Sequence, residues 1–315
     1  MNTAISLDGA CRLEGLGVIR ADGADAAAFL QGQLTTDIAG LSESRACLAG
    51  FCSAKGRLQA SFIVWRESPE SFVLVCSKDL LAGTLKRLSM FVMRAKCRLS
   101  DASDEIALWG LAGASAAARL DDALPWQRRA HAGQSIVRLP DAEAVARAMV
   151  AAPSADMGLP SSAPALGLDA WRWLDVRSGI VTIEAATVDR FVPQMVNFEL
   201  VGGVDFKKGC YPGQEVVARS QYRGTTKRRT FLFECDVLPR PGDDVFAGVA
   251  EGAMSEAVGT VATAAEAPDG GVASALIEVR LAALGSDLRL ASASGPRLRQ
   301  VELPYPVAVE AEPAL

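Results

Sequence analysis

Hydrophobic positions follow two different periods between residues 21 and 179. In some stretches apolar residues recur every three to four positions, as on one face of an amphipathic helix. Between them lie short runs rich in Val, Ile, Leu and Phe, which are typical of strands. The expected helices cover residues 21–34, 78–94, 114–124, 142–152 and 169–179. The expected strands cover residues 57–66, 71–76, 95–100, 105–111 and 134–139, the first two joined as a hairpin.

The pattern changes near residue 229. Four short apolar runs then follow one another, separated by the turn-forming stretches PRPGDD, EGAMSE and EAPDGG. Short strands with Pro/Gly turns at this spacing predict a small β-barrel. Because strands and helices alternate before this point, the expected fold class is α+β, with helices against mixed or antiparallel sheets. We expect residues 1–229 to form two intertwined α+β subdomains and residues 230–315 to form the barrel.

Composition excludes several classes of protein. Half of the 315 residues are hydrophobic and 22% are charged, which favours a folded chain with a sizeable core over disorder. The net charge of −5 argues against general coating of nucleic acid. The N-terminus is too polar for a signal peptide, and no window approaches 18 uninterrupted apolar residues. We therefore expect a soluble cytoplasmic protein without a membrane partner.

The cysteines and the histidine restrict the chemistry further. Seven cysteines, with no C-x-x-C pair among them, argue against a disulfide framework and are typical of reduced, mostly buried thiols. His131 is the sole histidine and lies in a polar context, so we expect it on the surface. A multi-histidine metal site is impossible, and the sequence predicts no firm metal site.

The segment 207–229 stands out by its charge and its glycines. It carries seven basic residues and one acid, Glu215, which gives it +6 and leaves −11 for the rest of the chain. Such a segment favours an anionic partner, although a solvated surface face would have the same composition. Pro212-Gly213 suits a type II turn, and turn glycines beside cations can cradle a carboxylate or phosphate. Cys210 lies beside two lysines, which favour a thiolate; the alternative is a buried structural thiol.

The same region carries a family resemblance. The motifs are FVPQ (191–194), Asn197, GG (202–203), FKKGCYPGQE (206–215), VAR (217–219) and YRG–KR (222–228), with weaker matches at 29–37 and 51–58. They resemble the signature of the YgfZ-type folate-binding proteins, which are relatives of the glycine-cleavage T-protein. The resemblance implies a ring of three small domains with folate in the central channel and a closing β-barrel. It also implies tetrahydrofolate as the cofactor.

The resemblance further implies a set of site residues. Cys210 would be the functional thiol. Trp173 matches a family position associated with folate, and the basic residues after 207 would meet the anionic glutamate tail, with a contribution from Lys55. The folate-binding residues expected in this way are Trp173, Lys208, Gly209, Tyr211, Gln214, Glu215, Arg223, Arg228, Asn197 and Lys55.

Two positions depart from the T-protein pattern. T-protein enzymes carry an aspartate near Gln59–Ala60 that handles the substrate amine, and this chain has no carboxylate there. This argues against aminomethyl transfer by the T-protein mechanism. Many relatives also have a glutamate two residues before Gly179, where this chain has Arg177. Reversing the charge at a hydrogen-bonding position is expected to alter the contact with the pterin.

Three functions are compatible with these features. The resemblance favours a folate-binding accessory protein that supports biogenesis or repair of iron–sulfur enzymes, and through them tRNA methylthiolation. Its partners would be such enzymes or their assembly proteins. The alternatives are a tetrahydrofolate-dependent one-carbon transferase and an RNA-binding module without folate, which the acidic balance disfavours. Cys210 could ligate a cluster, form an adduct or only pack, and any cluster would need ligands from a second molecule.

Overall fold

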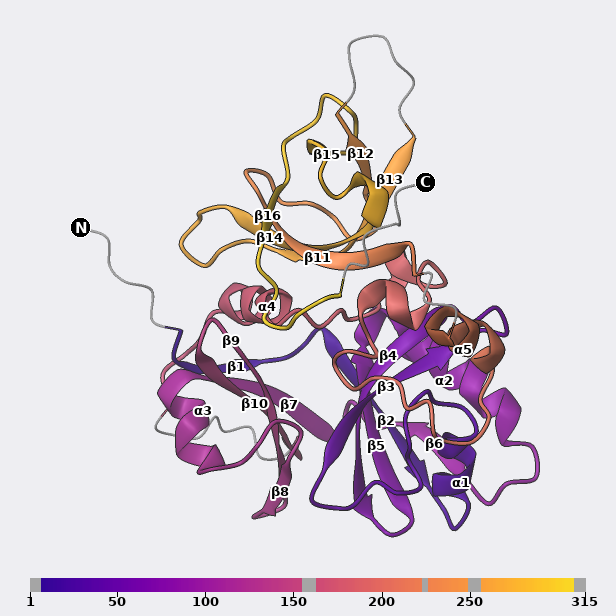
Figure 1. Ribbon diagram of the computed structural model, residues 1–315. Coiled ribbons are helices and arrows are strands. Elements are labelled where there is room, and N and C mark those ends of the chain that lie inside the picture. The colour runs from indigo at the N-terminus through magenta and orange to yellow at the C-terminus, as the bar shows by residue number, and fades with distance from the viewer. Residues whose placement is uncertain (1–6, 155–162, 223–225, 249–255, 309–315) are drawn as a thin grey trace.

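The computed structural model describes residues 7–154, 163–222, 226–248 and 256–308. Within these residues the strands form three sheets, and all strand pairs are antiparallel. Figure 1 shows two sheets side by side and the third stacked across them, with helix α4 between. The predicted α+β class with antiparallel sheets and a C-terminal β-unit is confirmed.

The first sheet carries two helices on its outer side. Its strand order is β3 (Ala46–Cys52), β4 (Leu58–Ser68), β5 (Ser71–Ser77), β2 (Leu16–Asp22) and β6 (Arg98–Asp101). The helices are α1 (Ala26–Gln31) and α2 (Lys78–Val92). Alternation along β4 and β5 sends one set of side chains to the helices and the other to the second sheet. The predicted hairpin and the helix from residue 78 are confirmed, whereas α1 is shorter than predicted because β2 continues to Asp22.

The second sheet takes its edge strand from the start of the chain. Its order is β1 (Gly9–Arg12), β7 (Ile106–Ala112), β10 (Val145–Pro153), β9 (Gln134–Ala142) and β8 (Arg128–His131), with helix α3 (Gly113–Leu120) packed on it. The predicted helix at 142–152 is wrong, because this stretch is strand β10. Pairing with β7 on one side and β9 on the other outweighs the helix propensity of its alanines. His131 is exposed, as predicted.

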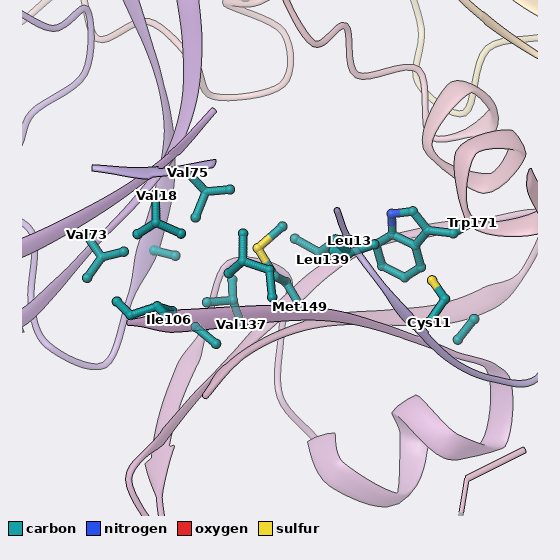
Figure 2. Packing of buried hydrophobic residues seen from close by; sticks show 14 of the residues in the cluster. Cys11, Leu13, Val18, Val73, Val75, Ile106, Val137, Leu139, Met149 and Trp171 are labelled. Carbon is teal, nitrogen blue, oxygen red and sulfur yellow. The ribbon is translucent and has the colours of Figure 1, made fainter. Parts of the chain in front are cut away.

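A shared apolar core joins the two sheets. Val18, Val73 and Val75 of the first sheet face Val137 and Met149 of the second, and all five are buried (Figure 2). The backbone adds to this contact, because Arg128 N–H donates to the Ser44 carbonyl across the two halves at 2.8 Å. The two halves therefore form one continuous body, and a cleft between them has fixed walls.

The third sheet lies across the end of the other two. Its order is β15 (Leu288–Leu290), β12 (Asp244–Ala247), β13 (Ala257–Ala265), β14 (Ala273–Arg280), β11 (Arg228–Cys235) and β16 (Arg299–Val301). Helix α4 (Leu168–Arg177) packs against β13 and β14 on one side and β1 and β9 on the other. Gly179 has a φ of +74°, which suits the helix stop predicted there.

Short helices connect α4 to the third sheet. They are η1 (Ala185–Thr187), η2 (Pro193–Val196) and α5 (Gln214–Tyr222), with η3 (Leu281–Ala283) following β14. Residues 214–222 carry no predicted helix, yet α5 begins directly after the Pro212-Gly213 turn. Among the described residues, no helix combines the length and the apolar character needed to cross a membrane.

Candidate functional site

A cleft opens where the first sheet, the second sheet and α4 meet. Its enclosed cavity volume is small, about 80 Å³. Its walls are apolar residues of β3, β4, β5, β9 and β10, and its polar groups come from β4, β10, α4 and the segment that follows α4. The residues with aromatic, charged or hydroxyl side chains are Ser61, Phe62, Trp126, Arg147, Trp171, Asp175, Ser178 and Thr182. An apolar slot with a few convergent polar groups is typical of a small-molecule site.

Arg147 and Asp175 form the charged centre of this cleft. Arg147 lies on β10 with a fully buried side chain, and its Nη2 donates to Asp175 Oδ1 on α4. Burial raises the pKa of Asp175, opposed by the charge of Arg147 and a hydrogen-bonding interaction with the Trp171 side chain. Nearly half of the Asp175 side chain, 46%, is accessible, because it faces the cleft. Arg147 Nε is buried and has no hydrogen-bond partner within the described residues, so the cleft wall holds an unpaired donor beside an accessible carboxylate.

Two tryptophans contribute differently to the cleft wall. The Trp171 ring packs against Gly110, where a Cβ would lie 2.5 Å from the ring, and the Arg147 guanidinium lies 4.9 Å from the ring centroid. These neighbours leave Trp171 almost fully buried. Trp126 is half-buried and adopts a φ of +67°, which is rare for a bulky residue. Its backbone is held by Arg138 O and Ala46 N, at 2.8 Å each.

Trp173, the predicted folate residue, lies outside this cleft. It is on the same helix as Trp171 but faces the third sheet, where its Nε1 donates to Ser274 Oγ at 3.1 Å. Arg177 stacks on its ring at 5.5 Å and forms ion pairs with Glu143 at 2.5 Å and Glu234 at 3.4 Å. Trp173 lines a second, more open hollow with Glu234 and the 267–274 turn, which has a cavity volume of about 260 Å³. Arg177 therefore ties the second and third sheets together and does not line the central cleft.

We call residues 208–213 the KGCY loop. Its first residue, Lys208, has a buried side chain. Its Nζ donates to the carbonyls of Gln31 and Leu34, the latter at 2.6 Å, at the C-terminal end of α1. It also lies 5.0 Å from the centroid of the Tyr211 ring. Burial lowers the pKa of Lys208 to about 8, opposed by the charges of Asp37, Asp205 and Cys210. The ammonium group therefore fixes the loop to α1.

A close approach of two glycines fixes the other end of the loop. Gly213 has a φ of +78°, and a Cβ there would lie 2.4 Å from the Ser53 carbonyl oxygen. Gly56, in the β3–β4 turn, has a φ of +70° and lies directly against it. Glycine is the residue that combines this backbone conformation with this contact. The predicted Pro212-Gly213 turn is thus the point where the loop packs tightly against the β3–β4 turn of the first sheet.

The remaining loop residues surround an exposed thiol. All seven thiols are free, and Cys210 is the exposed one among them. Gly209 is exposed beside it, whereas Tyr211 is buried and in contact with the apolar core below. Gln214 begins α5, Glu215 is exposed in its first turn, and Lys55 is exposed in the β3–β4 turn. The structure therefore gathers Lys55 and residues 208–215 into one surface region.

The other predicted site residues have structural partners elsewhere. Asn197 is buried with a φ of +56°, and its Nδ2 donates to the Thr230 carbonyl at 2.7 Å. Its Oδ1 has no partner among the described residues. Arg228, on β11, forms a bidentate pair with the buried Glu278 of β14. Arg223 lies outside the described residues.

One apolar layer separates the loop from the cleft. Tyr211 of the loop belongs to the same buried cluster as Leu48 and Val181, which line the cleft. Sequence reasoning identified the loop by its motif but missed Trp126, Arg147, Trp171 and Asp175. The available signal was the W-x-W pair in α4: because side chains four apart share a helix face, Trp171 lies with Asp175, and Trp173 points to another face.

Metal ligands do not converge in the described part of the chain. No group of three or more His, Cys, Asp or Glu side chains there has the geometry to hold a metal ion.

Comparisons with known proteins identify the family. Residues 9–148 match the family described as the GCVT N-terminal domain. The "tRNA-modifying protein YgfZ" of Edwardsiella ictaluri is 33% identical over 81% of this chain and 79% of the relative. That of Photorhabdus laumondii is 32% identical over 74% of this chain and 73% of the relative.

A solved structure shares the fold. The glycine cleavage system aminomethyltransferase T from Bartonella henselae superposes with a TM-score of 0.72, over 93% of this chain and 84% of its own, at 18% identity. At this identity the likeness concerns the fold. Together with the curated relatives, these findings confirm the resemblance carried by the KGCY motif, and the chain belongs to the YgfZ family.

Proposed function

We propose that this protein binds a reduced folate in the central cleft and acts as an accessory factor in tRNA modification. The observation that carries the proposal is the pairing, in one apolar cleft, of a half-buried aromatic ring with an accessible carboxylate and an unpaired guanidinium donor. A pterin is a flat ring with donors and acceptors along its edge. Trp126 would stack on that ring, and Asp175 and Arg147 would bind its edge.

Two features support this ligand. The left-handed backbone of Trp126 is a strained conformation of the kind that concentrates at ligand sites. The unpartnered Nε of Arg147 is a buried donor that a ligand oxygen or ring nitrogen would satisfy.

A calorimetric titration with tetrahydrofolate under reducing conditions tests the ligand and its place. Trp126→Leu should weaken binding at least about tenfold through loss of stacking, whereas Trp126→Phe keeps most of the affinity. Trp173→Leu is the matched control, because Trp173 is an aromatic residue of comparable burial outside the cleft. Full binding by Trp126→Leu with loss of binding by Trp173→Leu would move the ligand to the interface of α4 with the third sheet.

The cellular role follows from the relatives' name and the exposed thiol. The curated relatives are named as tRNA-modifying proteins. Enzymes that methylthiolate tRNA carry iron–sulfur clusters, so we propose that this protein maintains such enzymes and that Cys210 is its functional thiol. In a strain lacking the protein, the Cys210→Ser variant should accumulate normally yet fail to restore methylthiolated tRNA. Restoration by Cys210→Ser would exclude the thiol while leaving the folate proposal intact.

A one-carbon transferase is the second candidate, and Asp175 favours it. The chain lacks a carboxylate at residues 59–60, but α4 supplies one to the cleft from a different element. Because burial raises the pKa of Asp175, its protonated form is favoured, which suits proton exchange with an amine bound in the cleft. Bound methylenetetrahydrofolate would supply the one-carbon unit. Transfer to ammonia by the wild-type protein, lost in Asp175→Asn, would establish this activity; no transfer would leave the accessory role.

A further inference from the structure

Helix α2 ends in an exposed apolar surface that the cleft and the loop do not use. Met90, Phe91 and Met93 are 71%, 43% and 87% exposed. The helix already buries Leu81 and Leu88 against the first sheet, so the exposed residues belong to a different face and to the residue after the helix. Large apolar side chains clustered on a surface mark interaction sites in soluble proteins.

The backbone at the end of α2 keeps one of these side chains in solvent. Met93 follows the last helical residue and has a φ of +44°. Its ψ of −102° puts this residue outside the left-handed helical region, so a side chain there is strained. The chain places an almost fully exposed methionine at this position. Strain combined with exposure of an apolar residue favours a role in binding over a role in folding.

Cations surround these apolar residues. Residues 80–100 contain five basic residues and no acid. All five are exposed, and none has a salt-bridge partner within the described residues. They are Lys86, Arg87, Arg94, Lys96 and Arg98. We name these five residues together with Met90, Phe91 and Met93 the α2-end surface; Figure 1 shows α2 on the side of the first sheet away from the second.

The chemistry of this surface favours a protein partner. Phosphates of RNA would pair with the cations but would leave Met90 and Met93 in water, and Phe91 alone offers a ring for base stacking. A lipid surface binds helices that lay a whole apolar face into the headgroups, whereas the apolar face of α2 is buried in its own domain. An acidic segment with apolar side chains satisfies both parts of the surface. Methionine is common where one surface accepts varied apolar side chains.

We propose that the α2-end surface binds an acidic segment of a partner protein that carries leucine or phenylalanine side chains. The apolar side chains of the segment would cover Met90, Phe91 and Met93, and its carboxylates would pair with the surrounding cations. β6, which carries Arg98, is the edge strand of the first sheet, so the segment can also approach from that side. The surface is distinct from the cleft and the KGCY loop, so this binding does not depend on folate.

The test uses the full chain and a synthetic labelled peptide in fluorescence anisotropy. The peptide is an amphipathic helix of about five turns, with Leu and Phe on one face and Glu on the other. A second peptide keeps every Glu and replaces Leu and Phe with Gln. The first peptide should bind at least about tenfold more tightly than the second, because burial of even one large apolar side chain supplies that factor. Equal binding of the two peptides would overturn the proposal.

Two double variants test whether the peptide binds at the α2-end surface. Met90→Gln with Met93→Gln, and separately Arg94→Glu with Lys96→Glu, should each weaken the peptide at least about tenfold. The control pair Val237→Gln with Leu238→Gln removes two other exposed apolar residues, 45% and 46% exposed, and should leave binding unchanged. All of these side chains are solvent-exposed, so the variants should unfold at wild-type urea concentrations. An equal effect of the control pair would overturn the assignment.

Competing occupants are measured with the same variants. Sedimentation of the wild-type chain, binding to vesicles of phosphatidylcholine and phosphatidylglycerol, and binding to a single-stranded RNA oligonucleotide are each compared with Met90→Gln/Met93→Gln. The sedimentation behaviour, the vesicle binding and the RNA binding should be nearly the same for the wild type and for this variant. Dimerisation, vesicle binding or RNA binding that is tighter than peptide binding and lost in that variant would replace the protein partner with the corresponding occupant.

Discussion

Replacing Gly213 with alanine tests how the KGCY loop is held. The added Cβ would lie 2.4 Å from the Ser53 carbonyl oxygen and 2.6 Å from Gly56. These neighbours are backbone atoms, so they cannot rotate away as a side chain would. The φ of +78° adds a second cost, because an alanine disfavours this conformation.

The free-energy cost can be worked from these two terms. The left-handed backbone costs an alanine about 1–2 kcal/mol. Overpacking adds about 1–3 kcal/mol. The lower freedom of the unfolded alanine chain offsets about 0.4–1 kcal/mol, so the free energy of unfolding should fall by about 1–5 kcal/mol.

Gly209→Ala is the matched control in the same motif. No atom lies within 4 Å of its added Cβ, and its φ is not positive. Its stability in urea should therefore change by less than about 1 kcal/mol. If Gly213→Ala unfolds at the same urea concentration as Gly209→Ala, the loop is not locked at Gly213 and the reasoning fails.

A second readout separates loop displacement from global unfolding. Cys52 is buried beneath the loop in the same cluster as Tyr211. In a Cys210→Ser background, Gly213→Ala should expose Cys52 to iodoacetamide if the loop lifts, whereas Gly209→Ala should not. Protection of Cys52 in both variants, together with a lower unfolding free energy for Gly213→Ala, would mean that the strain is absorbed inside the core.

Three further results are expected. Iodoacetamide should modify one thiol quickly in the native protein and none in Cys210→Ser, because the other six are buried or half-buried. Gly110→Ala should lower the free energy of unfolding by about 1–3 kcal/mol in urea and weaken tetrahydrofolate binding, because its Cβ overlaps the Trp171 ring. The pKa of Lys208, lowered by burial from 10.5 to about 8, means that between these values the unfolded chain holds a proton that the folded chain has lost. From pH 7.5 to 9.5 the wild type should therefore gain stability relative to Lys208→Met, by at most about 2 kcal/mol because two carbonyls favour the charged form. A constant difference would show that Lys208 stays protonated.

Elements with strong periodicity could be predicted from the sequence, and elements defined by tertiary pairing could not. In the 57–76 hairpin and in the helix from residue 78, the apolar residues recur at the spacing of a strand and of a helix, respectively. Residues 142–152 are rich in alanine, which suits a helix in isolation. In the protein they form the central strand β10, and only the presence of β7 and β9 on both sides selects that conformation. The helix α5 was missed because the turn and charge signals before it dominated the interpretation of its sequence.

The loop could be predicted from the sequence, whereas the cleft could not. The KGCY loop is one continuous stretch, so its composition and family motif identified it. The cleft is assembled from Trp126, Arg147 and Asp175, which lie on separate elements, and none of them has a distinctive sequence neighbourhood. Trp173 was expected from the family resemblance, whereas helix phase relative to two different sheets decides which tryptophan of α4 faces the cleft. That phase is a property of the packed α4 and not of its sequence alone.

The net charge of a segment, counted along the sequence, does not show which of its charges are free to attract a ligand. The +6 of residues 207–229 predicted an anionic ligand, yet Lys208, Arg228 and Arg229 are bound to internal acceptors or carboxylates. Charges paired in this way contribute little to an external field. The five cations of residues 80–100 attracted no attention as a motif, yet all five are exposed and none has a salt-bridge partner in the described chain. Lys207, Arg219 and Lys227 of the basic segment are exposed in the same way, so the acidic groups of a partner should be attracted both to the α2-end surface and to this segment.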